Sequence, residues 1–228
     1  MKIPNYIIIV LISFITISSF SQSNLDSLNY YYKDNNLIKA LEFGERLELD
    51  LDLISDKRNL ASIKSNNGVM YYSIGEFQKA NKKFDEALVI CEEIEEISST
   101  EKAIVKKQAS RNLKELGELE RAKKLIIESI EIFKSNRKFN QGDYADALRL
   151  LGDIYKAEGK INKAIPILLE SAEIFKQTFG ENSFYAYSLQ SIGNCYFLVE
   201  DYNNAELYYS NSIKIQEELN SEPSDYAL

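Results

Sequence analysis

The stretch Gly159-Lys160-Ile161-Asn162-Lys163-Ala164 decides the fold, because its pattern Gly-x-apolar-x-x-Ala returns at a fixed interval along the chain. Residues 75–80 and 117–122 repeat the pattern, and residues 200–205 keep everything except the glycine. The four alanines lie 42, 42 and 41 residues apart, and Ala40 stands another 40 residues upstream. This self-similarity predicts one structural unit that is stacked about five times.

Each unit has the pattern of two helices joined by a tight turn. In the fourth copy, Leu148, Leu151 and Tyr155 follow one another at steps of three and four, as along one face of a helix. Gly159 allows that helix to end, and Asn162 is a good cap for the next one. The apolar face of this second helix comprises Ile165, Leu168, Ala172 and Phe175. Because the turn is short, the two helices are predicted to form an antiparallel hairpin.

Small residues occupy the positions where the two helices of a hairpin should approach most closely. The fourth copy has Gly152 on the first helix and Ala164 on the second. Larger side chains there would hold the backbones apart. The corresponding pairs are Gly68 with Ala80, Ser110 with Ala122, and Gly193 with Ala205.

These residues resemble the tetratricopeptide repeat family. The matching residues are Leu151-Gly152, Tyr155, Gly159 and Ala164 in the fourth copy, and Gly68, Tyr71, Gly75, Phe77, Ala80, Phe84 and Ala87 in the second. The resemblance covers about residues 22–228 and implies an all-α, right-handed α-α superhelical solenoid of about five hairpins. The family's short form repeats every 34 residues or so, whereas this chain repeats every 41 or 42, as in the kinesin-light-chain-like branch.

The period predicts the domain boundaries. Residues 22–60, 61–102, 103–144, 145–185 and 186–226 are the five predicted repeats, and a sixth begins at residue 227. The first copy is the weakest, with Gly44 where a bulky aromatic residue is expected. A long coiled coil has a similar composition, but it needs unbroken heptads, and the glycine-centred breaks exclude it.

Residues 1–21 have the pattern of a secretory signal peptide. Lys2 supplies a positive start, residues 7–17 are an apolar run, and Ser19-Phe20-Ser21 supplies small residues for cleavage. The alternative is a retained anchor, although the run is shorter than the roughly 20 residues that span a bilayer. Export to the periplasm or the extracellular space is therefore expected, with no membrane span after cleavage.

The composition excludes several classes of function. The chain has a net charge of -8, which disfavours a nucleic-acid partner. It contains no histidine, which removes histidine-based nucleophile arrangements and imidazole zinc sites. Its glycines are scattered and form no phosphate-binding loop. Cys91 and Cys195 are interpreted as buried apolar side chains. We therefore expect no enzyme, no cofactor and no metal.

In the family, the first helices of successive repeats line a concave groove. The resemblance places Lys107, Arg111, Lys114, Arg149, Lys156, Gln190 and Asn194 there, along with Ser65, Val69, Tyr72, Asp153 and Phe197. Cations in the middle of the groove favour a carboxylate or an acidic peptide segment as the ligand. The alternative is that they are ordinary solvent-facing lysines and arginines. The expected partner is a protein or peptide.

Two further expectations concern the end of the sequence and the role of the chain. Ala227 is the counterpart of the alanines that open each repeat, so the chain is expected either to be part of a longer polypeptide or to self-associate through an uncapped C-terminal end. The leading hypothesis is an exported, non-enzymatic interaction scaffold. The alternative is the N-terminal sensory or regulatory region of a longer protein with a separate output domain. A glycan-binding envelope component would need aligned aromatic platforms, for which the tyrosines are too scattered.

Overall fold

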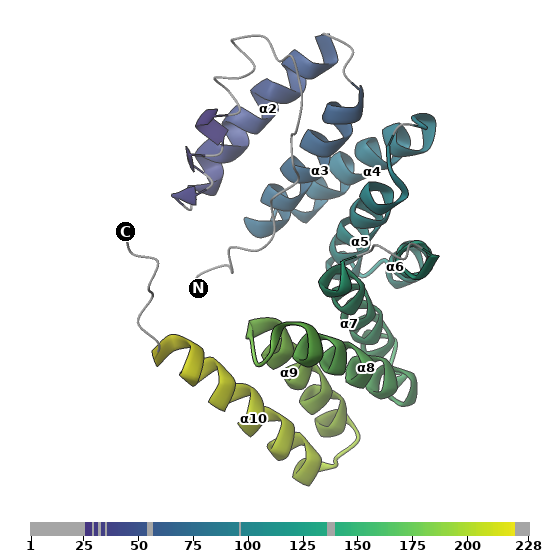
Figure 1. Cartoon of the computed structure of the whole chain (residues 1–228). Coiled ribbons are helices and arrows are strands. Elements are labelled where there is room, and N and C mark those ends of the chain that lie inside the picture. The colour runs from purple at the N-terminus through teal and green to yellow at the C-terminus, as the bar shows by residue number, and fades with distance from the viewer. Residues whose placement is uncertain are drawn as a thin grey trace. The chain divides into compact units, whose positions relative to one another are not determined.

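The computed structural model describes residues 26–28, 30–31, 33–34, 36–53, 57–95, 97–135 and 140–221. All regular structure in these residues is helical, which confirms the all-α prediction. The labelled helices are α2 (Leu37–Leu53), α3 (Lys57–Ser73), α4 (Phe77–Glu93), α5 (Ser99–Glu115), α6 (Leu119–Ser135), α7 (Gln141–Ala157), α8 (Ile161–Phe179), α9 (Ser183–Leu198) and α10 (Tyr202–Ser221) (Figure 1). They fall into two compact units, Met1–Leu116 and Gly117–Leu228, each with its own packing.

In the first unit, α3 contacts α2, α4 and α5. Three apolar clusters hold these helices together. One lies around Leu28, Ala40 and Met70, a second around Leu47 and Ile63, and a third includes Ala61, Ala87, Cys91, Ile97 and Val105. The core of this unit is therefore divided among successive helix junctions, as expected when each repeat buries its apolar face against its neighbours.

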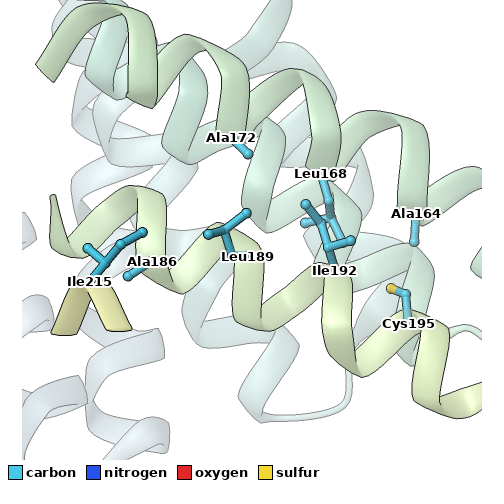
Figure 2. Close-up of a cluster of buried hydrophobic side chains, with 8 residues drawn as sticks. All are labelled: Ala164, Leu168, Ala172, Ala186, Leu189, Ile192, Cys195 and Ile215. Atoms are coloured by element: carbon cyan, nitrogen blue, oxygen red, sulfur yellow. The ribbon is translucent and has the colours of Figure 1, made fainter. Parts of the chain in front are cut away.

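In the second unit, α7 contacts α6, α8 and α9, and α9 contacts α8 and α10. Figure 2 shows the main apolar cluster, in which Leu168 on α8 faces Leu189 and Ile192 on α9. Ile215 joins the cluster from α10. The α7–α8 and α9–α10 hairpins are thereby packed against one another through α8 and α9.

The turns inside the hairpins share one backbone geometry. Gly75, Gly117 and Gly159 have φ angles of 82°, 77° and 74°, in the left-handed region that glycine enters without steric cost. Glu200 occupies the equivalent place with a φ of 62°. Its turn is closed by hydrogen bonds from the amides of Glu200 and Asp201 to the carbonyls at positions 197 and 196, the same pattern as at Gly159. The fourth turn therefore keeps its shape without its glycine.

The glycines of the first helices allow the second helices to approach closely, as predicted. A Cβ added at Gly152 would lie 2.6 Å from the side chain of Leu168, and one at Gly193 would lie 2.8 Å from the Tyr209 ring. At Gly68 it would lie 2.8 Å from the Phe84 ring. The alanines of these pairs are buried, but the tightest contact of each glycine is with the side chain one helical turn beyond the alanine.

A buried serine hydrogen-bonds the two helices of the α7–α8 hairpin to each other, and another does so in the α9–α10 hairpin. The Ser171 hydroxyl on α8 donates to the Ala145 carbonyl on α7 at 2.7 Å. The Ser212 hydroxyl on α10 donates to the Ala186 carbonyl on α9 at 2.8 Å. Both pairs are 26 residues apart, so the same bond recurs at the same place in two successive hairpins.

A buried charged cluster joins α2, α3 and α4 in the first unit. The Glu48 carboxylate accepts hydrogen bonds from Lys64 at 2.7 Å, Lys83 at 2.8 Å and Asn67 at 2.9 Å. The Lys64 ammonium also donates to Glu86 at 2.6 Å. We call Glu48, Lys64, Lys83 and Glu86 the Glu48 cluster. A Cβ on Gly44 would lie 2.2 Å from the Asn67 amide oxygen, which explains why this repeat lacks the expected bulky residue.

Several expectations fall on residues outside this description. Residues 1–21, which hold the signal-peptide pattern, and the sixth-repeat start at residue 227 lie outside the described residues. Among the helices that are described, none is long and apolar enough to cross a bilayer.

Candidate functional site

The candidate site is the solvent-facing side of the first helices, which are adjacent within each unit. In the second unit these helices are α7 and α9, and in the first unit they are α3 and α5. The predicted groove residues divide accordingly. Lys107, Arg111 and Lys114 lie on α5, and Arg149, Lys156, Gln190 and Asn194 lie on α7 and α9.

On α7, the predicted cations are part of a row of alternating charges. Arg149 donates to Asp146 at 2.8 Å and to Asp153 at 3.1 Å. Lys156 donates to the other oxygen of Asp153 at 2.8 Å. We call these four residues the α7 ladder. Two cations and two carboxylates compensate one another, so these four side chains form an ordered polar row with no net charge among them.

On α9, the exposed side carries no charge at all. The helix contains no Asp, Glu, Lys or Arg, and its solvent-facing positions recur at steps of three and four. We call this set the α9 row, and it comprises Tyr187, Gln190, Asn194 and Phe197. Gln190 and Phe197 are exposed and Asn194 is half-buried. The row offers amide groups in its centre and an aromatic ring at each end.

The amide of Asn194 is held in place from the neighbouring helix. The Tyr209 hydroxyl on α10 donates to the Asn194 side-chain oxygen at 2.7 Å. An asparagine side chain has one acceptor oxygen and two N–H donors, so the bond fixes which side of the amide faces the solvent. Asn194 therefore presents its N–H groups in a defined orientation.

On α5, the structure corrects part of the sequence prediction. Lys107 is only 4% exposed, and Ser65 on α3 is also buried, so neither is a solvent-facing groove position. Arg111 donates to Gln108 at 3.0 Å, and Lys114 pairs with Glu115 at 2.5 Å. Burial of a charged residue requires local partners, which a periodic pattern does not reveal.

Sequence reasoning missed two residues of this face, Asp146 and Tyr209. Asp146 lies three residues before Arg149, a spacing that brings side chains together on a helix and was available in the sequence. Tyr209 lies 15 residues after Asn194, and only the hairpin geometry shows that its hydroxyl meets the amide.

The described residues offer no metal site of the usual kind, since none of their His, Cys, Asp and Glu side chains form a group of three or more that could hold an ion. The two cysteines are free and buried, as predicted. Burial raises the pKa of the Cys91 thiol to about 11 and also raises the pKa of Cys195. Both thiols are therefore protonated at neutral pH and are poor nucleophiles.

The hairpins also match known proteins. Residues 141–218, which contain α7 to α10 nearly complete, match the family model described as tetratricopeptide repeat. The α7–α8 and α9–α10 hairpins are thus similar to tetratricopeptide repeats. This repeat builds protein–protein interaction scaffolds, which are generally not enzymes. The search of curated proteins found no match.

Several solved structures share this tetratricopeptide-repeat fold. The apo form of RapI is 21% identical, with a TM-score of 0.76 over 88% of this chain and 72% of RapI. A putative kinesin light chain with nearly identical repeats, from Podosopora anserina, is 15% identical, with a TM-score of 0.68 over 90% of this chain and 98% of that one. A Rap protein complexed with Competence and Sporulation Factor is 18% identical, with a TM-score of 0.75 over 91% of this chain and 57% of the Rap protein. At these identities the likeness concerns the fold.

Proposed function

We propose that this chain is a non-enzymatic scaffold that binds a protein or peptide segment across the α7 ladder and the α9 row. The observation that carries the proposal is the Asn194 amide, which Tyr209 holds with its N–H groups available beside the exposed Gln190. Amide donors in fixed positions suit the carbonyl groups of an extended peptide, and the aromatic ends of the row suit its side chains.

The charges of this face favour a ligand without a large net charge. An acidic ligand, which the cations in the sequence suggest, would have to compete with Asp146 and Asp153 for Arg149. Those internal pairs are already at hydrogen-bond distance in the free chain. The α9 row has no charge that would attract an acidic ligand either.

The neighbouring structures support the same class of partner. One of the similar folds is a Rap protein complexed with Competence and Sporulation Factor. That structure shows a scaffold of this fold with a bound factor, and we extend only the class of function to this chain.

The test is a random peptide library selected on the purified chain, followed by affinity measurements on the selected peptides. Asn194→Ala should weaken binding about tenfold, because it removes the positioned donors. Tyr209→Phe should weaken it by a smaller factor, because the amide remains but is no longer held. Asn211→Ala, at an exposed position elsewhere on α10, is the matched control and should bind as the natural chain does. Equal binding by Asn194→Ala, or no selected peptide, would refute the proposal.

We further propose that the chain is exported. The support is the pattern of residues 1–21, with a lysine, an apolar run and small residues before Gln22. Expression with and without these residues, followed by fractionation and N-terminal sequencing, tests it. Export and a new N-terminus near Gln22 are expected, and retention of the intact chain in the cytoplasm would contradict it.

A further inference from the structure

The turn that joins α9 to α10 exposes a compact group of apolar side chains. We call this group the apolar tip, and its members are Phe197, Leu198, Val199 and Tyr202, with exposed fractions of 54%, 58%, 48% and 58%. The rings of Phe197 and Tyr202 meet edge to face, with centroids 5.7 Å apart. Apolar side chains gathered on a surface in this way mark interaction sites more often than scattered ones do.

The preceding turn of the same unit has the opposite chemistry. Between α7 and α8, Glu158 pairs with Lys160 at 2.8 Å and with Lys123 at 2.5 Å. Gly159 forms the left-handed position of that turn. The two turns share their backbone hydrogen bonds, so the hairpin fold does not require an apolar tip.

The apolar tip also retains backbone strain. Glu200 is in the left-handed region, where a residue with a Cβ is disfavoured, while the equivalent positions have glycine. Strain of this kind gathers at sites of function, where a side chain is needed in place of the more stable glycine. At this position the retained side chain is an exposed carboxylate in the middle of the apolar tip.

The charge around the apolar tip defines the partner it fits. Asp201 follows Glu200 directly and accepts a hydrogen bond from the Asn204 amide at the start of α10. Glu200 and Asp201 lie in the turn itself and Glu206 lies about one helical turn after Tyr202, so the charged side chains of α9, the turn and the start of α10 are all acidic. We propose that the apolar tip is a docking site for a protein segment that presents an apolar side chain flanked by Lys or Arg. This site shares Phe197 with the α9 row but uses neither the α7 ladder nor Asn194, so it would exist even if that face bound nothing.

Charge also argues against a second copy of this chain as the occupant. Two copies docked tip to tip would bring two sets of these carboxylates together, and like charges that face one another across an interface repel. A basic segment instead gains electrostatic attraction, and its apolar side chain packs against the exposed rings of Phe197 and Tyr202.

The experiment selects random displayed peptides on the full chain, then measures the selected peptides by fluorescence anisotropy at low and high salt. Leu198→Ser/Tyr202→Ser removes apolar area while leaving Phe197, which also belongs to the α9 row. Glu200→Lys reverses the charge and keeps a side chain in the same backbone conformation. The control is Leu207→Ser, an exposed apolar position on α10 outside the apolar tip.

We expect peptides with an aromatic or large aliphatic residue beside Lys or Arg. Their affinity should fall at least tenfold in Leu198→Ser/Tyr202→Ser and in Glu200→Lys, and should fall with salt, while Leu207→Ser and Asn194→Ala leave it unchanged. Selected peptides that lose affinity only in Asn194→Ala would overturn the proposal for the apolar tip, while they would support the proposed peptide binding at the α9 row. Selected peptides that resemble residues 222–228 would overturn it, because the occupant would then be a segment of this chain. A dimer in sedimentation that Leu198→Ser/Tyr202→Ser dissociates would also overturn it, because the occupant would then be a second copy. An absence of selected peptides would also overturn it.

Discussion

Replacing Glu48 by glutamine should destabilise the first unit more than any single surface change. The side chains of Glu48, Lys64 and Lys83 are only 11%, 15% and 16% exposed, so their charges are largely removed from water. Glu48→Gln leaves the ammonium groups of Lys64 and Lys83 at this junction, and Glu86 is then the one carboxylate that remains in the Glu48 cluster. Removing one partner of a buried ion pair costs about 3–5 kcal/mol, and the residual exposure places this case near 3 kcal/mol.

A second variant distinguishes the cost of leaving a buried charge without its partner from the contribution that the complete ion-pair cluster makes to stability. Each of these positions is apolar in at least one other repeat, with Leu88 for Glu48, Leu148 for Lys64 and Leu125 for Lys83. Glu48→Leu/Lys64→Leu/Lys83→Leu combined with Asn67→Ala, as at Ala109, removes Glu48 and the three side chains that bond to it. It leaves Glu86, whose side chain is 33% exposed. Apolar replacement of a buried ionic group is often neutral or stabilising, so this variant should lie within about 1 kcal/mol of the natural chain or above it.

Urea unfolding followed by circular dichroism measures both variants, with the free energy taken from midpoint and slope. Glu42→Gln is the control, because its pair with Arg46 is more than half exposed and surface pairs contribute about 0–1 kcal/mol. A Glu48→Gln variant as stable as the control would show that the cluster is solvated and would refute the reasoning.

The same cluster sets a pH dependence. Burial alone would raise the pKa of the Glu48 carboxyl, but hydrogen bonds from Lys64, Lys83 and Asn67 outweigh it and hold the pKa below its usual value of 4.5. A depressed pKa stabilises the fold above the unfolded-state value and loses that contribution as the pH falls through the folded-state value. The natural chain should therefore lose stability below about pH 4.5, and the apolar variant should lose less of it.

Three further changes test other parts of the fold by thermal or urea unfolding. Glu200→Gly should stabilise the chain by about 1 kcal/mol by relieving the left-handed strain, whereas Glu200→Ala should not, and equal effects would exclude strain as the cause. Ala164→Leu should cost about 1–3 kcal/mol because the position is fully buried, and an unchanged melting temperature would contradict the close packing of α7 and α8. Ser98→Ala should cost about 1 kcal/mol, because the hydroxyl of Ser98 accepts from the Glu101 amide while Glu101 accepts from the Ser98 amide; no loss would mean that water replaces this cap.

Periodicity in the sequence was sufficient to predict the hairpins. The glycines at 75, 117 and 159 marked turns that need a left-handed residue, and the structure has one at each. Spacing also assigned residues 200–205 to the same pattern, because the apolar and alanine positions remain in register, and the structure shows that Glu200 takes the backbone conformation of the glycines. Local geometry of this kind depends on residues close in the chain, which a pattern reveals.

The charges of the site could not be predicted in the same way. Lys107 and Glu48 have the sequence context of surface residues, yet both are buried. Their burial depends on which groups neighbouring helices bring to them, and a helical period does not contain that information. Arg149 is a different case, because its partners Asp146 and Asp153 lie three residues before it and four residues after it on the same helix, so their pairing could have been predicted from the spacing.

Two serine hydrogen bonds lie inside single hairpins, one from Ser171 to the Ala145 carbonyl and one from Ser212 to the Ala186 carbonyl. Each of these hairpins therefore contains both partners of the bond that joins its two helices. Such a module can be duplicated or exchanged by recombination without redesigning its interior, since only the outer surfaces must suit new neighbours. Lengthening this array by copying residues 145–185 should therefore be tolerated more readily than inserting a segment cut between a serine and its alanine.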